Sequence, residues 1–467
     1  MKSRRLHSAN AIDLIALISA ARAPMLVAVI LRISLMLAAF VFTGTSVMTQ
    51  GDTTSYLDPG RNLILHGVFA AAGSPEIDRT PGYPLFAELT GMLWDNVLLT
   101  AAAQIFISLA SLLLIKKIAD RIFSNRNAGI AAAWFYAIEP LSIVYTTRLM
   151  PETLFTFLLL LVMDRLLSFK QSRKISPIAV AGVLLAAATY VRPVSYYLVF
   201  PLAIGLAVIA GKQNKLRWKA PAMLLIATLP WLAVWQLRNR IETGYSGFSS
   251  IVEKNLYFFQ SAEVTAELQH ISLATQQKRL GYGDEADYLT VHPDQASWSR
   301  TQRLSFMHVQ ATKILRDHLS LYLKTHFKGV AVVAFTPCAT ELLQLLAAYP
   351  PADTMPHRIL NQGIVTSIHQ AFLAHPVVAL TMLLLEVFLL ILYAFAIRGF
   401  FAAMRNPMTW MLIGIALYFL LISGGAQAVG RYRIPVMPEL CILAAGGFAL
   451  RAKKLRSHNS SAAEVTD

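Results

Sequence analysis

Long apolar segments alternate with short polar ones along most of this 467-residue chain. Each apolar segment has about 17–23 residues, enough for a helix to cross the roughly 30 Å hydrocarbon layer of a membrane. Because backbone amides cannot stay unpaired in lipid, these segments are predicted to be helices. The pattern predicts ten spans, at 26–45, 97–115, 128–147, 153–169, 176–191, 194–210, 220–237, 376–397, 408–424 and 434–450.

A further apolar block, at 329–348, is ambiguous. Counting it as a span would move the basic residues at 398–405 and 451–456 to the other side of the membrane. We therefore interpret it as an interfacial or re-entrant helix. The sequence thus predicts an all-α integral membrane protein with about ten transmembrane helices.

Composition and charge support this picture. Charged residues make up only 14% of the chain, where a soluble domain carries about 25%. The net charge of +15 could indicate a protein that binds nucleic acid. The distribution of this charge instead follows the positive-inside rule, so no nucleic-acid partner is predicted. The rule predicts a multi-pass protein with both termini in the cytoplasm. The basic clusters lie between alternate spans, at 2–5, 116–126, 165–174, 212–219, 398–405 and 451–456.

Two outward regions of a single membrane domain (1–467) are long enough to carry chemistry, and 457–467 reads as a polar cytoplasmic tail. Residues 44–96 are rich in Asp and Glu and contain a short predicted helix, with Asp52 as its N-cap candidate. Residues 238–375 form the second region. Within it, 297–323 has apolar residues at helical spacing, typical of a helix on a membrane face, and 281–293 is turn-rich and predicted to be a loop.

Several motifs occur in order along the chain. The first outward region reads GDTTSYLDPGRNLILHGVFA and then DRTPGYPLFAEL; later come EPLSIVYTTRLMPETLFTFLLLL, ATYVRPVSYYL and GRYRIPVMPEL. The ordered set resembles the GT-C superfamily of membrane glycosyltransferases, in particular the bacterial group related to aminoarabinose transferase and the protein O-mannosyltransferases. The resemblance covers about residues 25–240 well and 300–450 loosely.

The resemblance implies an inverting glycosyltransferase in a bacterial inner membrane, with its active site facing the periplasm. Its donor would be a polyprenyl-phosphate sugar and its acceptor a glycan, a lipid or a protein, as in lipopolysaccharide modification. The sequence leaves open the sugar, the acceptor, the prenyl length, the oligomeric state and whether a divalent metal takes part; it indicates no certain cofactor.

Such a transfer needs a carboxylate to take the proton of the attacking hydroxyl. Asp52 is the candidate base, and its alternative role is the helix N-cap. Glu152, after Pro151, is the candidate second carboxylate, which would orient the acceptor or bind a divalent ion. Its alternative role is to favour the positive end of the helix that it opens.

The departing phosphate needs positive charge nearby. Arg79 precedes a Thr-Pro-Gly-Tyr-Pro turn and could hold phosphate oxygens as a fork, or could pair with Asp78 as an interfacial anchor. The candidates for phosphate binding are Arg79, Arg192 and Arg431, with Arg148 and Arg433 as weaker ones. Asp78, Tyr56 and Tyr83 complete the list of candidate site residues.

Two charges fall inside predicted spans. Arg32 is expected to extend toward the cytoplasmic surface, without a catalytic role. Glu139 is expected to face a polar cavity or to be protonated. A transporter or flippase of a lipid-linked glycan is the alternative function, but it would place such residues near the membrane midplane rather than at outward helix ends. A structural scaffold would leave the acidic first region unexplained.

Overall fold

The fold is taken from a computed structural model, which describes residues 17, 19–49, 51–211, 215–349 and 375–449. The basic cluster at 2–5 and the expected polar tail lie outside the described residues, as does the cluster at 451–456.

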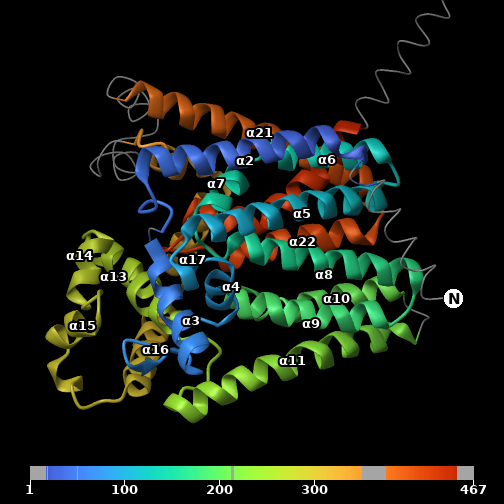
Figure 1. The fold of residues 1–467 in the computed structure, drawn as a ribbon. Coiled ribbons are helices and arrows are strands. Elements are labelled where there is room, and N and C mark those ends of the chain that lie inside the picture. The colour runs from blue at the N-terminus through green and yellow to red at the C-terminus, as the bar shows by residue number, and fades with distance from the viewer. Residues whose placement is uncertain (1–16, 18, 50, 212–214, 350–374, 450–467) are drawn as a thin grey trace, which may run out of the picture.

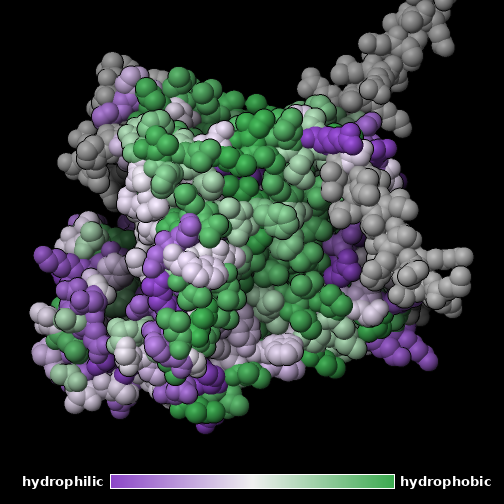
Figure 2. Space-filling view, in the orientation of Figure 1, coloured by the Kyte–Doolittle hydropathy of each residue, from purple (hydrophilic) through white to green (hydrophobic). Residues whose placement is uncertain are grey.

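Roughly parallel helices form the main body of the molecule, and they lie side by side in Figure 1. Figure 2 shows a hydrophobic surface across the middle of this bundle, with hydrophilic residues gathered toward its two ends. The helices are α2 (Arg22–Thr43), α5 (Val97–Phe123), α6 (Arg126–Ala137), α7 (Pro140–Thr147), α8 (Glu152–Ser172), α9 (Ser176–Val191), α10 (Val199–Ala210), α11 (Leu216–Thr243), α21 (Pro376–Ala403), α22 (Pro407–Ile422) and a last helix at 437–449.

Each of the ten predicted spans falls on one of these helices or on an adjoining pair. Within the described residues, four single helices are long and apolar enough to cross a membrane: α2, α5, α11 and α21. The pair α6 and α7 passes the same test with a bend of 53°, and α9, α10 and α22 are apolar but shorter. The all-α membrane fold is therefore confirmed, whereas the number of crossings stays a prediction.

The remaining elements gather at one end of the bundle, where α3 and the lobe formed by α13–α16 lie in Figure 1. The first outward region contains η1 (Gly51–Thr53), α3 (Thr54–His66), the antiparallel strands β1 (Ala70–Ala71) and β2 (Ser74–Pro75), α4 (Gly82–Thr90) and η2 (Met92–Trp94); η3 (Pro193–Ser195) connects α9 to α10. The second contains α12 (Ile251–Asn255), the π-helix η4 (Leu256–Ser261), α13 (Ala262–Gln269), α14 (Leu273–Arg279), α15 (Glu285–Val291), η5 (Pro293–Gln295), α16 (Arg300–Asp317), α17 (Leu319–Phe335) and α18 (Ala339–Leu345), and η6 (Gly430–Val436) precedes the last helix.

Two expectations for the second outward region are wrong. The stretch 281–293 contains the helix α15, because Asp284 and Asp287 form a reciprocal capping box at its start. The apolar face of α16 does not lie on a membrane face: Leu304, Met307 and Ala311 are buried in a cluster with aromatic residues of η4. Protein rather than lipid covers this face.

The ambiguous block 329–348 is not one continuous helix. It contains the end of α17 and the short α18, and residues 336–338 separate the two. Gly329 allows α17 to approach the loop before η6, because a Cβ atom there would lie 2.2 Å from the backbone nitrogen of Gly425. The break prevents one uninterrupted span across the block.

The bend between α6 and α7 explains both charges found inside the spans. Glu139 caps α7, accepting hydrogen bonds from the backbone nitrogens of Leu141 at 3.0 Å and Ser142 at 2.6 Å. Arg32 is fully buried and donates to the carbonyl oxygens of Tyr136 and Ala137 at the bend. Arg32 therefore does not extend to the surface, and Glu139 serves the helix start rather than a polar cavity.

Replacing Arg32 with methionine should lower the thermal stability of the purified protein. The buried carbonyl groups of Tyr136 and Ala137 would each lose the hydrogen bond from Arg32, at a cost of about 1–3 kcal/mol. Arg32→Lys should recover part of this loss. The measurement is thermal unfolding in detergent, and unchanged midpoints for both variants would contradict the proposed role of Arg32.

Candidate active site

Asp52 lies at the end of the bundle, in the short helix η1 between α2 and α3. Its Oδ1 accepts a hydrogen bond from Arg79 Nη2 at 3.1 Å, and its Oδ2 accepts one from Arg431 Nη2 at 2.5 Å. The helix α3 begins after Thr53 without a side-chain cap. The N-cap role of Asp52 is therefore wrong, because its carboxylate binds two guanidinium groups instead.

A fixed turn holds Arg79 beside Asp52. The carboxylate of Glu76 accepts a hydrogen bond from the backbone nitrogen of Arg79 at 2.9 Å. The guanidinium group then donates to Ser55 Oγ at 2.9 Å and to the hydroxyl of Tyr56 at 3.2 Å, and it lies over the Tyr56 ring. Every nitrogen of this guanidinium group has a protein partner, so Arg79 is well suited to position Asp52.

The proline-rich turn after Arg79 depends on Gly82 for close packing. Gly82 is the first residue of α4, and a Cβ atom there would lie 2.7 Å from the carbonyl group of Tyr190 at the end of α9. Tyr83 follows, and its buried hydroxyl donates to Gln104 Oε1 at 3.1 Å. This contact ties the turn to α5.

Glu152 forms the second half of the site. It is the first residue of α8 and is 1% exposed. Its Oε1 accepts a hydrogen bond from Arg192 Nη1 at 3.0 Å, whereas its buried Oε2 has no partner among the described residues. The helix-end role does not account for this second oxygen, which is buried without a hydrogen bond from the described residues.

Tyr432 connects the two halves. Its ring lies 5.4 Å from the guanidinium carbon of Arg431 and 5.6 Å from that of Arg192. The buried Nε of Arg431 has no hydrogen-bond partner in the described part of the chain. We call Asp52, Arg79, Glu152, Arg192 and Arg431 the carboxylate–arginine cluster. Its three guanidinium groups and two carboxylates give it a net charge of one positive unit.

The charges around Asp52 decide its protonation state. Burial raises the pKa of the carboxyl group, but the positive charges of Arg431 and Arg79 outweigh burial and hold this pKa below its ordinary value. Asp52 is thus ionised at neutral pH but is a weak base while both arginines bind it.

Three of the weaker candidates lie in structural contacts outside this cluster. Asp78 binds Lys254 Nζ at 2.6 Å and Arg300 Nη2 at 3.0 Å, so it holds the second outward region and does not pair with Arg79. Arg148 donates to the side chain of Gln344 in α18. Arg433 is buried and donates to three carbonyl oxygens at the end of α17, those of Val333, Ala334 and Thr336.

The sequence did not single out Ser55, Gln104 or Tyr432 as site residues. Each contacts a residue that the motifs did identify: Arg79, Tyr83 and the two arginines at Tyr432, respectively. Ser55 and Tyr432 stand inside the quoted motifs GDTTSYLDPGRNLILHGVFA and GRYRIPVMPEL, so motif membership was the available signal for these two, and Gln104 had none.

Asp52 has no oxygen free for a divalent metal in this arrangement. Both oxygens of Asp52 accept hydrogen bonds from guanidinium groups, and no group of three His, Cys, Asp or Glu side chains suited to a metal occurs in the described ranges. The positive charge of the site is supplied by arginines.

Comparison with solved structures shows which known proteins share this fold. The archaeal oligosaccharyltransferase AglB from Archaeoglobus fulgidus, in complex with an inhibitory peptide and a dolichol-phosphate, matches 95% of this chain and 51% of its own, at a TM-score of 0.53 and 13% identity. The Archaeoglobus fulgidus oligosaccharyltransferase tethered with an acceptor peptide matches with a TM-score of 0.50 at 14% identity, over 95% of this chain and 50% of its own. The same enzyme in complex with Zn and sulfate matches with a TM-score of 0.50 at 13% identity, over 96% of this chain and 51% of its own.

The chain thus has the fold of the GT-C membrane glycosyltransferases and spans about half the length of these solved chains. Residues 78–235 match the family model of dolichyl-phosphate-mannose-protein mannosyltransferases. Together, the two findings confirm the resemblance seen in the sequence. No curated protein matches the sequence.

Proposed function

We propose that this protein transfers a sugar from a polyprenyl-phosphate donor to an acceptor hydroxyl, at the periplasmic face of a bacterial inner membrane. The observation that carries the proposal is the carboxylate–arginine cluster, which joins Asp52 to Arg431 and Glu152 to Arg192 at one end of an apolar bundle. The single positive charge left over matches the single negative charge of a phosphodiester donor. The family match and the dolichol-phosphate in the related AglB structure favour the same donor class.

The phosphate of the donor would bind chiefly to Arg431. Its Nε is unpartnered among the described residues, and only one of its nitrogens is bound to Asp52. The positive charge of Arg431 lowers the pKa of Asp52. When oxygens of the donor phosphate accept hydrogen bonds from Arg431, the phosphate partly neutralises this charge. Asp52 then becomes a stronger base as the donor enters, since an opposite charge nearby is what lowers a carboxyl pKa.

In the reaction, the acceptor oxygen attacks the anomeric carbon while its proton passes to Asp52. The bond between the anomeric carbon and the phosphate oxygen breaks, and polyprenyl phosphate leaves with the additional negative charge. A single displacement of this kind inverts the anomeric configuration. Arg431 and Arg192 would stabilise the leaving phosphate, and the free Oε2 of Glu152 would accept a hydrogen bond from a hydroxyl of the sugar or the acceptor.

Surface glycans and lipid-linked sugars in a deletion strain test this proposal. A transferase predicts that one decoration is missing while the donor, no longer consumed, persists in the membrane. A flippase predicts that the lipid-linked sugar is confined to the cytoplasmic leaflet. Mass spectrometry identifies the missing decoration, and unchanged surface glycans would contradict the proposed transfer.

Reporter fusions test the orientation. Fusions after Lys117, Lys174 and Arg405 are expected to report the cytoplasm, because basic residues there follow the positive-inside rule. Fusions after Asp78 and Arg240 are expected to report the periplasm. A cytoplasmic signal at Asp78 would place the cluster on the wrong side for the proposed reaction.

A further inference from the structure

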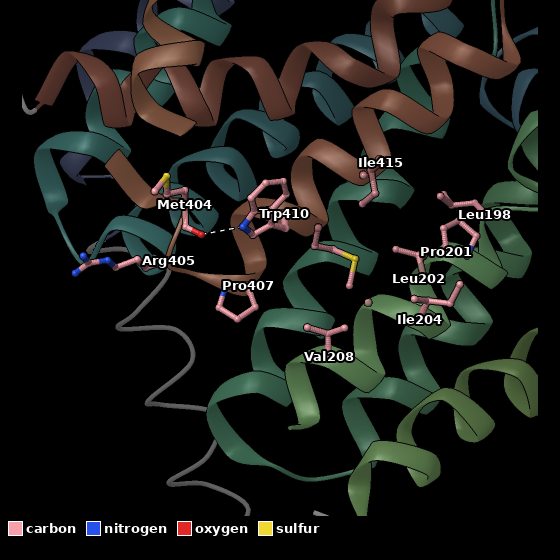
Figure 3. Close-up of a pocket in the computed structure, with 13 residues that line it drawn as sticks. Leu198, Pro201, Leu202, Ile204, Val208, Met404, Arg405, Pro407, Trp410 and Ile415 are labelled. Carbon is pink, nitrogen blue, oxygen red and sulfur yellow. Dashed lines mark hydrogen bonds between the residues drawn. The ribbon is translucent and has the colours of Figure 1, made fainter. Parts of the chain in front are cut away.

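A groove between α10 and α22 lies outside the carboxylate–arginine cluster. It encloses about 340 Å³ and is lined mainly by apolar side chains of the two helices, which Figure 3 shows facing one another. Ile204 and Val208 on one side and Trp410 on the other are exposed. In a membrane these exposed side chains face lipid, so the groove is open to the hydrocarbon layer.

One end of the groove is positively charged. Arg405 belongs to its lining and has no hydrogen-bond or ion-pair partner in the part of the chain that the structure describes. Nearby, Lys170 donates to Asn406 at 2.5 Å and Arg173 donates to the carbonyl oxygen of Ile209 at 3.0 Å. Within the described ranges, no carboxylate forms an ion pair with these three cations, which leaves their charge available to an anion.

We propose that this groove binds an anionic phospholipid, with one acyl chain between α10 and α22 and the phosphate group near Arg405. Basic sites between transmembrane helices recognise anionic headgroups in this way, because charge and apolar area act together. The donor of the proposed reaction is a less suitable occupant, since its phosphate belongs beside Arg192 and Arg431. The groove has its own cation, and the proposal does not depend on the transfer activity.

Gly414 offers a way to fill the groove without disturbing the protein. It belongs to the lining, and a Cβ atom there would meet no other atom within 4 Å. Leucine is also a better helix former than glycine. Gly414→Leu should therefore fold normally while its side chain takes the space of an acyl chain. Ala402→Leu, at an exposed position of α21 outside the groove, is the matched control.

The test measures retention of phosphatidylglycerol and phosphatidylcholine by the full-length purified protein, with native mass spectrometry. The wild type should retain phosphatidylglycerol preferentially. Arg405→Gln should weaken this retention about fivefold, the effect of one basic residue at an anionic membrane surface, whereas Arg398→Gln, on α21 outside the groove lining, should not. Gly414→Leu should reduce phosphatidylglycerol retention, and Ala402→Leu should leave it unchanged.

Three results would overturn the proposal. Equal retention of the two lipids would remove the role of the charge. Retention that neither Arg405→Gln nor Gly414→Leu changes would place the bound lipid elsewhere. Unchanged phosphatidylglycerol retention in Gly414→Leu, together with weaker binding of undecaprenyl phosphate, would assign the groove to the prenyl chain of the donor.

Discussion

Asp52→Asn should fold and bind donor while its turnover falls about 10²–10⁴-fold, the usual effect of losing a general base. The amide cannot take the proton of the acceptor hydroxyl at neutral pH. A residue that only caps a helix would tolerate this change, because Asn caps about as well as Asp. Asp52 does not cap α3, and its oxygens bind Arg79 and Arg431 instead. Turnover per folded molecule, measured in detergent or nanodiscs, decides the outcome.

Asp78→Asn is the matched control for this variant. Asp78 is also a carboxylate of the first outward region with two cationic partners, but these are Lys254 and Arg300, which hold the second region in place. Its loss should lower thermal stability with little change in turnover per folded molecule. If Asp52→Asn behaves in the same way, with full turnover and lower stability, Asp52 is a structural residue and the proposed mechanism fails.

Arg431→Ala should weaken donor binding and lower turnover about 10²–10³-fold, the scale found when one donor to a developing anion is removed. The free Nε and the bond to Asp52 place this guanidinium group between the base and the proposed phosphate position. Arg431→Lys should recover part of both quantities, because the charge survives but the planar fork is lost. A donor titration on purified variants measures both quantities.

Arg433→Ala provides the comparison for Arg431→Ala. It lies two residues further along the same short helix, η6, and its guanidinium group binds only carbonyl oxygens of α17 in the described structure. Its loss should reduce stability while donor affinity stays at the wild-type value. Wild-type donor affinity in Arg431→Ala would instead remove Arg431 from the phosphate site.

The helices of the bundle could be predicted because every span in lipid needs a long apolar segment whose backbone hydrogen bonds form within the segment. The bend at Glu139 could not be predicted. An acidic residue before proline inside an apolar segment can cap a helix, face a polar cavity or be protonated. The structure decides for the cap through the bonds to Leu141 and Ser142. The prediction that Arg32 extends to the cytoplasmic surface was wrong for a related reason. Its partners are carbonyl oxygens at the bend, which the sequence did not predict.

The candidate site shows a similar division. Motifs located Asp52, Arg79 and Arg431, but their pairing joins residues up to 379 positions apart in the chain. Such pairing depends on how the helices pack, which no local pattern encodes. The assumed pair of Asp78 with Arg79 was wrong because adjacent residues at a turn point to different partners.

The fate of a polyprenyl-phosphate sugar in the presence of the purified protein tests the central claim most directly. Protein in nanodiscs would be incubated with a panel of undecaprenyl-phosphate hexoses and pentoses and with membrane extract as the source of acceptor, and the products followed by mass spectrometry. The account predicts that one donor is cleaved to undecaprenyl phosphate with a matching glycosylated product, and that Asp52→Asn slows the formation of both about 10²–10⁴-fold. Intact donor throughout the panel, combined with donor movement across the bilayer in sealed vesicles, would contradict the account and identify a transporter.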